Sequence, residues 1–323
     1  MTGYPPVKIN LGLNVLRKRA DGFHDLETLF VQSRQFSDNL EIVTGDDYSR
    51  TMAGLVAKYG DRGGCFTGCQ PAGEDEDIPT LAQGISEDGK LMITVARAEG
   101  VDWDVRKDLC AKAYALLDND FKLPPAKIFL EKLSPVGAGL GGGSADAACT
   151  LTMLNEICNL GLSKEQLAGY AARLGSDCAF FVHGCPMFGE GRGEVLTPFE
   201  LPIDIEDAGR ECASPAIQDN AGAAYSAGKP AYELQIVVPE GISVSTAEAY
   251  RGITPAIPEM RLKDVLSRPV SEWKDLLVND FEATVFKAHP ELAAIKQSLY
   301  DSGAAYASMS GSGSALFALY EKE

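Results

Sequence analysis

Short apolar segments alternate with polar, glycine-rich stretches along the first part of the chain. The β-prone segments predict strands at residues 7–15, 40–43, 91–95 and 127–133. Between the second and third of these, residues 44–89 are rich in Gly, Asp, Glu and Thr and predict loops around short elements. Residues 104–118 predict an amphipathic helix, because apolar side chains recur at helical spacing at Val105, Leu109, Ala113 and Leu116.

The middle of the chain predicts two helices in succession. The first begins after a glycine-rich stretch and has its apolar repeat at Ala147, Leu151, Leu154 and Cys158. Ser163 with Gln166 three residues on makes a capping box, which opens a second helix that runs to about residue 174. Residues 178–182 and 186–188 then predict short strands.

Residues 200–230 differ in composition from the rest of the chain, being rich in Ala, Gly, Asp and Pro, and predict a linker or insertion. Beyond them the patterns predict strands at 234–238, 305–309 and 315–320, and helices at 246–251, 273–286 and 290–302. This order of elements predicts an α+β protein of two domains, residues 1–199 and 200–323.

Composition agrees with two domains and disfavours nucleic acids and anionic membranes as binding partners. The chain has 323 residues, 45% of them hydrophobic, which is enough for more than one core. Its formal net charge of -17 disfavours binding to nucleic acid or to anionic membranes, and no long basic patch offsets it. The sequence shows no leader-like start and no long uncharged apolar run, so we expect a cytoplasmic protein. We also expect a monomer or a homodimer.

The eight cysteines are spread irregularly and mostly lie in apolar stretches, where a free thiol behaves as a small hydrophobe. Cys65 and Cys69 form a close pair in a Gly-rich stretch. A zinc site there is disfavoured, because the chain offers no second pair nearby and has three histidines in all.

A glycine-rich loop between a predicted strand and a predicted helix is the strongest chemical signal in the sequence. Its glycines let consecutive amides turn toward one point and let a phosphate approach the main chain, at Gly137, Gly139, Gly141, Gly142 and Gly143. The helix that begins next adds its unpaired N–H groups and the positive end of its dipole. The loop therefore predicts an anion site built mostly from backbone.

The spacing leaves the class of phosphate site open. A P-loop is excluded, because no Lys-Ser or Lys-Thr follows the glycines. Gly137, Gly139 and Gly142 satisfy the dinucleotide fingerprint G-x-G-x-x-G, although the acidic residue expected further on would be Glu156, inside a helix. Dinucleotide binding is thus the second interpretation of the loop.

The segment from Pro135 to Ser144 closely resembles the phosphate loop of the GHMP kinases, the superfamily of galactokinase, homoserine kinase and mevalonate kinase. The match extends over residues 8–198 and returns at 243–255 and 309–313. Further matching segments are Lys-Ile-Asn-Leu at 8–11, Arg-Ala-Asp-Gly-Phe-His at 19–24, Leu-Gly-Ser-Asp-Cys at 174–178 and Phe-Gly-Glu-Gly at 188–191. The combination is specific, although each motif alone is not.

The resemblance implies a fold and a nucleotide site. The N-terminal domain would resemble the second domain of ribosomal protein S5, the C-terminal domain would be ferredoxin-like, and the active site would lie in the cleft between them. Ser144 would contact Mg²⁺ or a phosphate, and Asp146 is a second, weaker candidate. ATP would bind along Pro135, Val136, Gly137, Ala138, Gly139, Leu140, Gly141, Gly142, Gly143 and Ser144.

The resemblance also implies a substrate, a small molecule in which methylerythritol is linked to cytidine diphosphate in the non-mevalonate isoprenoid pathway. Its 2-hydroxyl would be phosphorylated, with Asp177 as the base and Lys8 beside it. The remaining substrate residues would be Asn10 near Lys8, and Phe23, His24 and Phe188 around the cytosine.

Two other functions remain open from the sequence. Another GHMP kinase acting on a sugar, homoserine or a mevalonate-type alcohol would not need aromatic residues for a base. A nucleotide-binding protein without catalysis would not need both Lys8 and Asp177. The segments 65–84 and 200–230 are longer than the family pattern, and the sequence gives no physical account of them.

Overall fold

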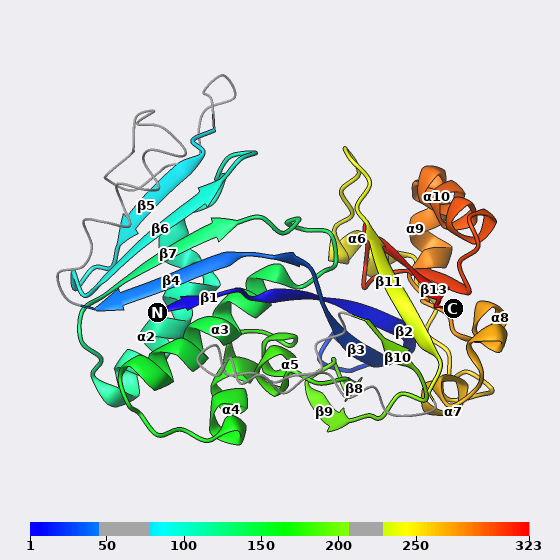
Figure 1. The fold of residues 1–323 in the computed structure, drawn as a ribbon, viewed down its shortest axis with the longest axis horizontal. Helices are drawn as coiled ribbons and strands as arrows, with labels where there is room; N and C mark the ends of the chain where they lie inside the picture. The colour runs from blue at the N-terminus through cyan, green and yellow to red at the C-terminus, as the bar shows by residue number, and fades with distance from the viewer. Residues whose placement is uncertain (45–77, 207–228, 323) are drawn as a thin grey trace.

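The computed structural model describes residues 1–44, 78–206 and 229–322, and it contains three β-sheets flanked by helices (Figure 1). The first sheet has the strand order β1-β4-β7-β6-β5, in which β6 and β7 are parallel and the other pairs antiparallel. Its strands are β1 (Thr2–Gly3), β4 (Asn39–Thr44), β5 (Leu81–Ile85), β6 (Leu91–Arg97) and β7 (Ala126–Lys132).

Helices pack on the first sheet and bury its apolar side chains in one large core. Asp108 caps the first of these helices through the Cys110 amide, after a short 3-10 turn at Val105–Lys107. The predicted capping box of Ser163 and Gln166 is present at the start of the third. The helices are α2 (Leu109–Phe121), α3 (Gly142–Ile157), α4 (Lys164–Leu174) and α5 (Cys178–His183).

The second sheet is dominated by a long antiparallel hairpin that crosses the middle of the molecule (Figure 1). Its order is β2-β3-β8-β9, with β2 (Pro6–Lys18), β3 (His24–Ser37), β8 (Met187–Glu190) and β9 (Val195–Pro198). Successive residues of β2 and β3 are buried on both faces. A strand buried on both faces shows no alternation, so the sequence pattern missed β3 altogether.

The third sheet has the order β10-β11-β13-β12 and carries the C-terminal helices. Its strands are β10 (Asp204–Ile205), β11 (Ala231–Val237), β12 (Tyr306–Met309) and β13 (Leu316–Glu321). The helices are α6 (Thr246–Arg251), α7 (Leu262–Leu266), α8 (Trp273–Leu276), α9 (Glu282–Ala288) and α10 (Pro290–Asp301), with a 3-10 turn at Val270–Glu272.

Two of the sequence predictions about elements are wrong. Residues 178–182 form helix α5 and not a strand. The predicted helix at 273–286 is interrupted after Leu276, because the next residues pair with β2: the Leu13 amide donates to the Val278 carbonyl and the Asp280 amide to the Leu13 carbonyl. The short strand β5 lies in the region 44–89, where short elements were expected, and the two-residue strand β10 lies near the start of the predicted linker 200–230.

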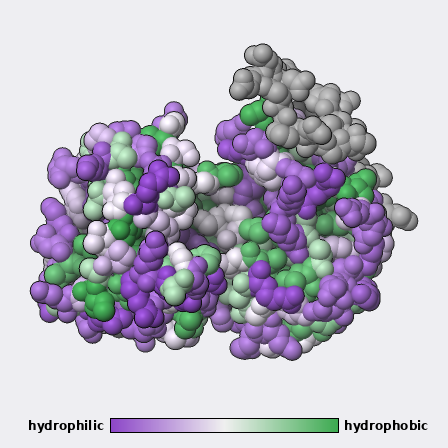
Figure 2. All heavy atoms as spheres, turned by 180° about the vertical axis from the view of Figure 1, so that it is seen from behind, coloured by the Kyte–Doolittle hydropathy of each residue, from purple (hydrophilic) through white to green (hydrophobic). Residues whose placement is uncertain are grey.

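The two halves of the chain share a hydrophobic core. Residues of β2, β3 and the glycine loop pack with residues of β11, β13 and α7 in one buried cluster. The Gln35 side chain adds two hydrogen bonds between the halves: it donates to the Ile236 carbonyl and accepts from the Ile236 amide. Seen from behind, the surface shows two lobes with a notch between them (Figure 2). The domain boundary at 199/200 stays a prediction.

Two other predictions concern residues that the structure only partly covers. Cys65 and Cys69 lie outside the described residues, as do most residues of the predicted insertions. Within the described ranges, no helix combines the length and apolar character required to cross a membrane.

Candidate active site

Lys8 lies near the start of β2 with its side chain almost completely buried. Its ammonium donates to the Gly139 carbonyl at 2.9 Å and to Asn10 Oδ1 at 2.5 Å, and it lies 3.6 Å from Asp177 Oδ2. Lys8 and Asn10 share a face because side chains alternate along a strand. The Asn10 amide group also donates to Thr28 Oγ1, so both of its ends have partners. In this structure Asn10 orients Lys8.

The glycine loop leaves β7, passes next to β2 and ends where α3 begins. Gly137, Gly139 and Gly141 all have positive φ, of 76°, 79° and 72°. This backbone conformation is open to glycine and strained for other residues. The loop is anchored by its buried side chains Ala138 and Leu140 and by the Lys8 amide, which donates to the Leu140 carbonyl at 2.8 Å.

Asp177 is the residue just before α5, and its side chain is 32% exposed. The side chain makes no capping bond to the helix that follows. It faces the Lys8 ammonium across the start of α3, although Lys8 is far away in the sequence. The predicted pairing of Lys8 with Asp177 is therefore present as geometry.

Ser144 lies in the first turn of α3, so it is not the N-cap of that helix, which is Gly141. The Ser144 hydroxyl lies near the thiol of Cys178, the residue after Asp177. Burial raises the pKa of the Cys178 thiol to about 11, so that thiol stays protonated at neutral pH. Ser144 consequently lies at the same end of α3 as Asp177 and the glycine loop.

A second glycine turn, residues 310–314 between β12 and β13, packs against the first. Ser310 Oγ donates to the Gly139 carbonyl at 3.2 Å, the same oxygen that accepts from Lys8. The Ala315 amide donates to the Ala138 carbonyl. Asn279, which the sequence did not single out, holds this turn by donating to the carbonyls of Met309 and Gly311.

Comparison with known proteins decides the family. A sequence profile described as the GHMP kinases N-terminal domain matches residues 108–185, and one for the GHMP kinases C-terminal domain matches residues 262–323. A 4-diphosphocytidyl-2-C-methyl-D-erythritol kinase of Bacteroides thetaiotaomicron is 38% identical, over 100% of this chain and 93% of that protein. The chain belongs to this kinase family. A kinase of the same name from Cytophaga hutchinsonii is 33% identical, over 99% of this chain and 92% of that protein.

Solved structures agree with this kinase family. A crystal structure of 4-(cytidine 5'-diphospho)-2C-methyl-D-erythritol kinase is similar with a TM-score of 0.64 and 26% identity, over 99% of this chain and 90% of that one. The mevalonate kinase of Methanococcus jannaschii, at 11% identity and a TM-score of 0.55 over 99% and 90% of the two chains, shows the GHMP fold alone. The resemblance to GHMP kinases and the α+β fold are confirmed, and the dinucleotide interpretation of the glycine loop is wrong.

The residues expected to bind cytosine in this kinase family do not all lie together. His24, at the start of β3, stacks on Tyr250 of α6 with ring centroids 4.7 Å apart and an angle of 19°. Phe23 is 53% exposed, and the Arg192 guanidinium lies over its ring. The sequence patterns did not single out Tyr250, although it lies in the matching segment 243–255. An aromatic side chain in that segment is the feature that could have identified Tyr250 as a candidate.

Phe188, the second aromatic residue expected around the base, lies in a buried position, and its role stays a prediction. Its side chain is fully buried, packed near Phe199 and beneath the Lys263 ammonium. Tyr250, in contrast, is partly exposed and nearly parallel to His24.

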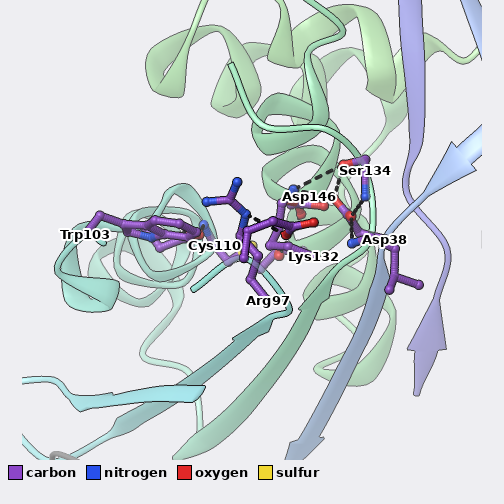
Figure 3. A network of polar contacts seen from close by, with 11 residues as sticks. Asp38, Arg97, Trp103, Cys110, Lys132, Ser134 and Asp146 are labelled. Atoms are coloured by element: carbon purple, nitrogen blue, oxygen red, sulfur yellow. Dashed lines mark hydrogen bonds and ion pairs between the residues drawn. The ribbon is translucent and has the colours of Figure 1, made fainter. Parts of the chain in front are cut away.

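A buried ionic cluster lies beneath the glycine loop (Figure 3). Lys132, the last residue of β7, pairs with Asp38 and with Asp146 of α3, and all three side chains are at most 5% exposed. Asp146 was expected to be a second candidate, after Ser144, for contact with Mg²⁺ or a phosphate. Its burial and its bond to Lys132 at 2.7 Å instead give it a partner inside the protein.

Proposed function

We propose that the chain transfers the terminal phosphoryl group of ATP to the 2-hydroxyl of 4-diphosphocytidyl-2-C-methyl-D-erythritol. The observation that carries the proposal is the Asp177 carboxylate. It is partly exposed, makes no capping bond to α5 and lies 3.6 Å from the buried Lys8 ammonium. The ammonium in turn binds the glycine loop through Gly139. A hydroxyl-activating carboxylate and a phosphate loop are thereby joined by one cation.

Asp177 orients the acceptor hydroxyl and receives its proton as the oxygen attacks. A weakly basic carboxylate is sufficient, because phosphoryl transfer depends chiefly on position and electrostatics. Lys8 contributes a fixed positive charge, which stabilises negative charge on the transferred group.

The glycine loop supplies the phosphate site of this proposal. Its amides, from residues 135 to 144, together with the first turn of α3, would face the β- and γ-phosphates of ATP. Mg²⁺ would be held with the phosphates and by the Ser144 hydroxyl, which fits the preference of this ion for few protein ligands. Within the described residues, no group of three His, Cys, Asp or Glu side chains could hold a metal by itself.

The experiment that tests the function is a panel of acceptors assayed with ATP and Mg²⁺. Diphosphocytidyl-methylerythritol is compared with mevalonate, homoserine and galactose, with phosphorylated products detected by phosphorus-31 NMR. Turnover confined to the cytidylyl substrate supports the proposal. Turnover of a different alcohol would overturn the substrate and keep the kinase, and ATP binding without any product would overturn catalysis.

Lys8 gives the activity a predicted pH dependence. Burial lowers the pKa of Lys8 from its ordinary value of 10.5, and attraction to Asp177 opposes that effect. The ammonium form is the active one, so kcat/KM should fall on the alkaline side with an apparent pKa below 10.5. The pH profile of Lys8→Arg is the comparison, since a guanidinium stays charged. An identical alkaline limb in both proteins would assign it to another group.

Tyr250 is predicted to determine affinity for the cytidylyl substrate. Replacing it with Ala should raise KM for that substrate about tenfold to a hundredfold, since a stacked base contributes roughly 1–3 kcal/mol. KM for ATP should change little, and Tyr250→Phe should keep the low KM because it keeps the ring.

The matched control is Phe188→Leu, which should lower the melting temperature through core packing and leave KM unchanged. A rise in KM for Phe188→Leu, with none for Tyr250→Ala, would restore the original assignment.

A further inference from the structure

Asp38, the single residue between β3 and β4, receives four hydrogen bonds inside the protein (Figure 3). Its Oδ1 accepts from the amides of Leu133 and Ser134, both at 2.7 Å. Its Oδ2 accepts from the Ser134 hydroxyl at 2.7 Å and from the Lys132 ammonium. These donors are the last residue of β7 and the two residues after it, so one carboxylate fixes the point where the chain turns into the glycine loop.

The same cluster also reaches the far end of the loop. Lys132 donates to Asp146 in the second turn of α3 at 2.7 Å. Gly142, the first residue of α3, packs directly on the cluster: a Cβ there would lie 2.7 Å from Ser134 Oγ and 3.4 Å from Lys132 Nζ. The start and the end of the glycine loop are therefore held against each other through Asp38, Lys132 and Asp146.

The two carboxylates of the cluster are not equivalent. Both oxygens of Asp38 are used as acceptors, whereas Oδ1 of Asp146 is buried and has no hydrogen-bond partner in the described part of the chain. Two acids share one ammonium, and burial raises the pKa of Asp146 well above its ordinary value. Asp38 is thus the residue whose geometry the loop depends on, and Asp146 is the acid whose charged form burial disfavours.

We propose that Asp38 is a positioning residue for ATP, which sets the distance between the two ends of the glycine loop and so the direction of its amides. Its hydrogen bonds come from Lys132, Leu133 and Ser134, and it acts through these residues. The inference rests on the proposed kinase function for its kinetic readout, but the affinity for ATP can be measured without turnover.

Replacing either acid with its amide removes the same charge and has opposite structural consequences. An Asn at position 38 must turn its NH₂ group toward donors whichever way it lies, because every oxygen of Asp38 accepts from a donor. An Asn at position 146 can offer its oxygen to Lys132 and place its NH₂ where the unpartnered oxygen now lies. Asp146→Asn is therefore the matched control for Asp38→Asn.

The experiment measures ATP binding by calorimetry, steady-state kinetics and amide hydrogen exchange for both variants. Asp38→Asn should weaken ATP binding about tenfold or more, with KM for the cytidylyl substrate within about twofold of wild type. Exchange should rise in residues 133–143 and not across the sheet as a whole. For Asp146→Asn, both the affinity for ATP and KM for the cytidylyl substrate should stay within about twofold of wild type.

Ser134→Ala keeps the Asp38 charge and removes one of its four donors, so it tests the proposal even if Asp38→Asn fails to fold. It should weaken ATP binding about two- to threefold. The proposal is overturned if the variants lose thermal stability with ATP affinity intact, if Asp146→Asn weakens ATP as much as Asp38→Asn, or if both substrates lose affinity in parallel. Intact ATP binding in wild type without turnover would contradict the proposed function and leave this inference standing.

Discussion

Replacing Asp177 with Asn is expected to lower kcat by about 10²- to 10⁴-fold, the range for loss of a positioned proton acceptor. An amide keeps the shape of the side chain and its dipole but cannot receive the proton of the acceptor hydroxyl. Both KM values should stay within severalfold of wild type, because the glycine loop and the stacking of His24 on Tyr250 are untouched. Single-turnover kinetics would place the loss in the chemical step.

Two comparisons separate catalysis from general damage. Asp118→Asn breaks a Lys90–Asp118 ion pair of α2 and should leave kcat unchanged. The melting temperature of Asp177→Asn should be close to wild type, since its carboxylate is partly exposed and caps no helix. Wild-type turnover by Asp177→Asn would remove Asp177 from the catalytic role.

Gly139→Ala is expected to have the largest effect on stability, a loss of about 2 to 5 kcal/mol in the free energy of unfolding. Gly139 has a φ of 79°, where an L-residue with a side chain costs about 1–2 kcal/mol. A Cβ there would also overlap the Ser310 carbonyl oxygen and lie 3.1 Å from the Gly313 carbonyl oxygen, adding roughly 1–3 kcal/mol of overpacking. Urea denaturation measures the loss, and ATP affinity should fall with it because the two glycine turns are pushed apart.

Gly161→Ala is the matched control for the backbone conformation alone. Gly161 has a φ of 68°, and a Cβ there would meet nothing within 4 Å. It should cost about 1–2 kcal/mol and leave ATP affinity unchanged. Equal losses for the two variants would show that the contact between Gly139 and the second glycine turn is loose.

The elements that the sequence predicted correctly are determined by residues that lie close together in the chain. Ser163 and Gln166 form both bonds of the capping box, and the helix they open ends at Leu174. Helix α6 has the predicted bounds, and α10 begins at Pro290 as expected. The strand, glycine loop and helix around Gly139 are also present in order. Each of these depends on residues a few positions apart, so the chain need not be folded for the pattern to be visible.

The elements that the sequence did not predict depend on what surrounds them. Strand β3 lies between β2 and β8 in its sheet and is buried on both faces, which erases the alternation of a strand with one exposed face. Residues 178–182 are apolar enough for a strand, yet they form α5 because they pack against α3 and α4. The predicted helix at 273–286 ends after Leu276, because the backbone that follows forms hydrogen bonds with Leu13.

The sequence by itself determined the family of the protein and the residues proposed for its site: the glycine loop, Lys8, Asp177 and His24 follow from motifs whose chemistry is local. Only the tertiary structure decided that Phe188 is buried and that Tyr250 stacks on His24, since no nearby pattern distinguishes the two rings. It also decided that Asp38 and Asp146 meet at Lys132. Burial and contacts between distant segments arise when sheets and helices pack, and no short stretch of sequence encodes them.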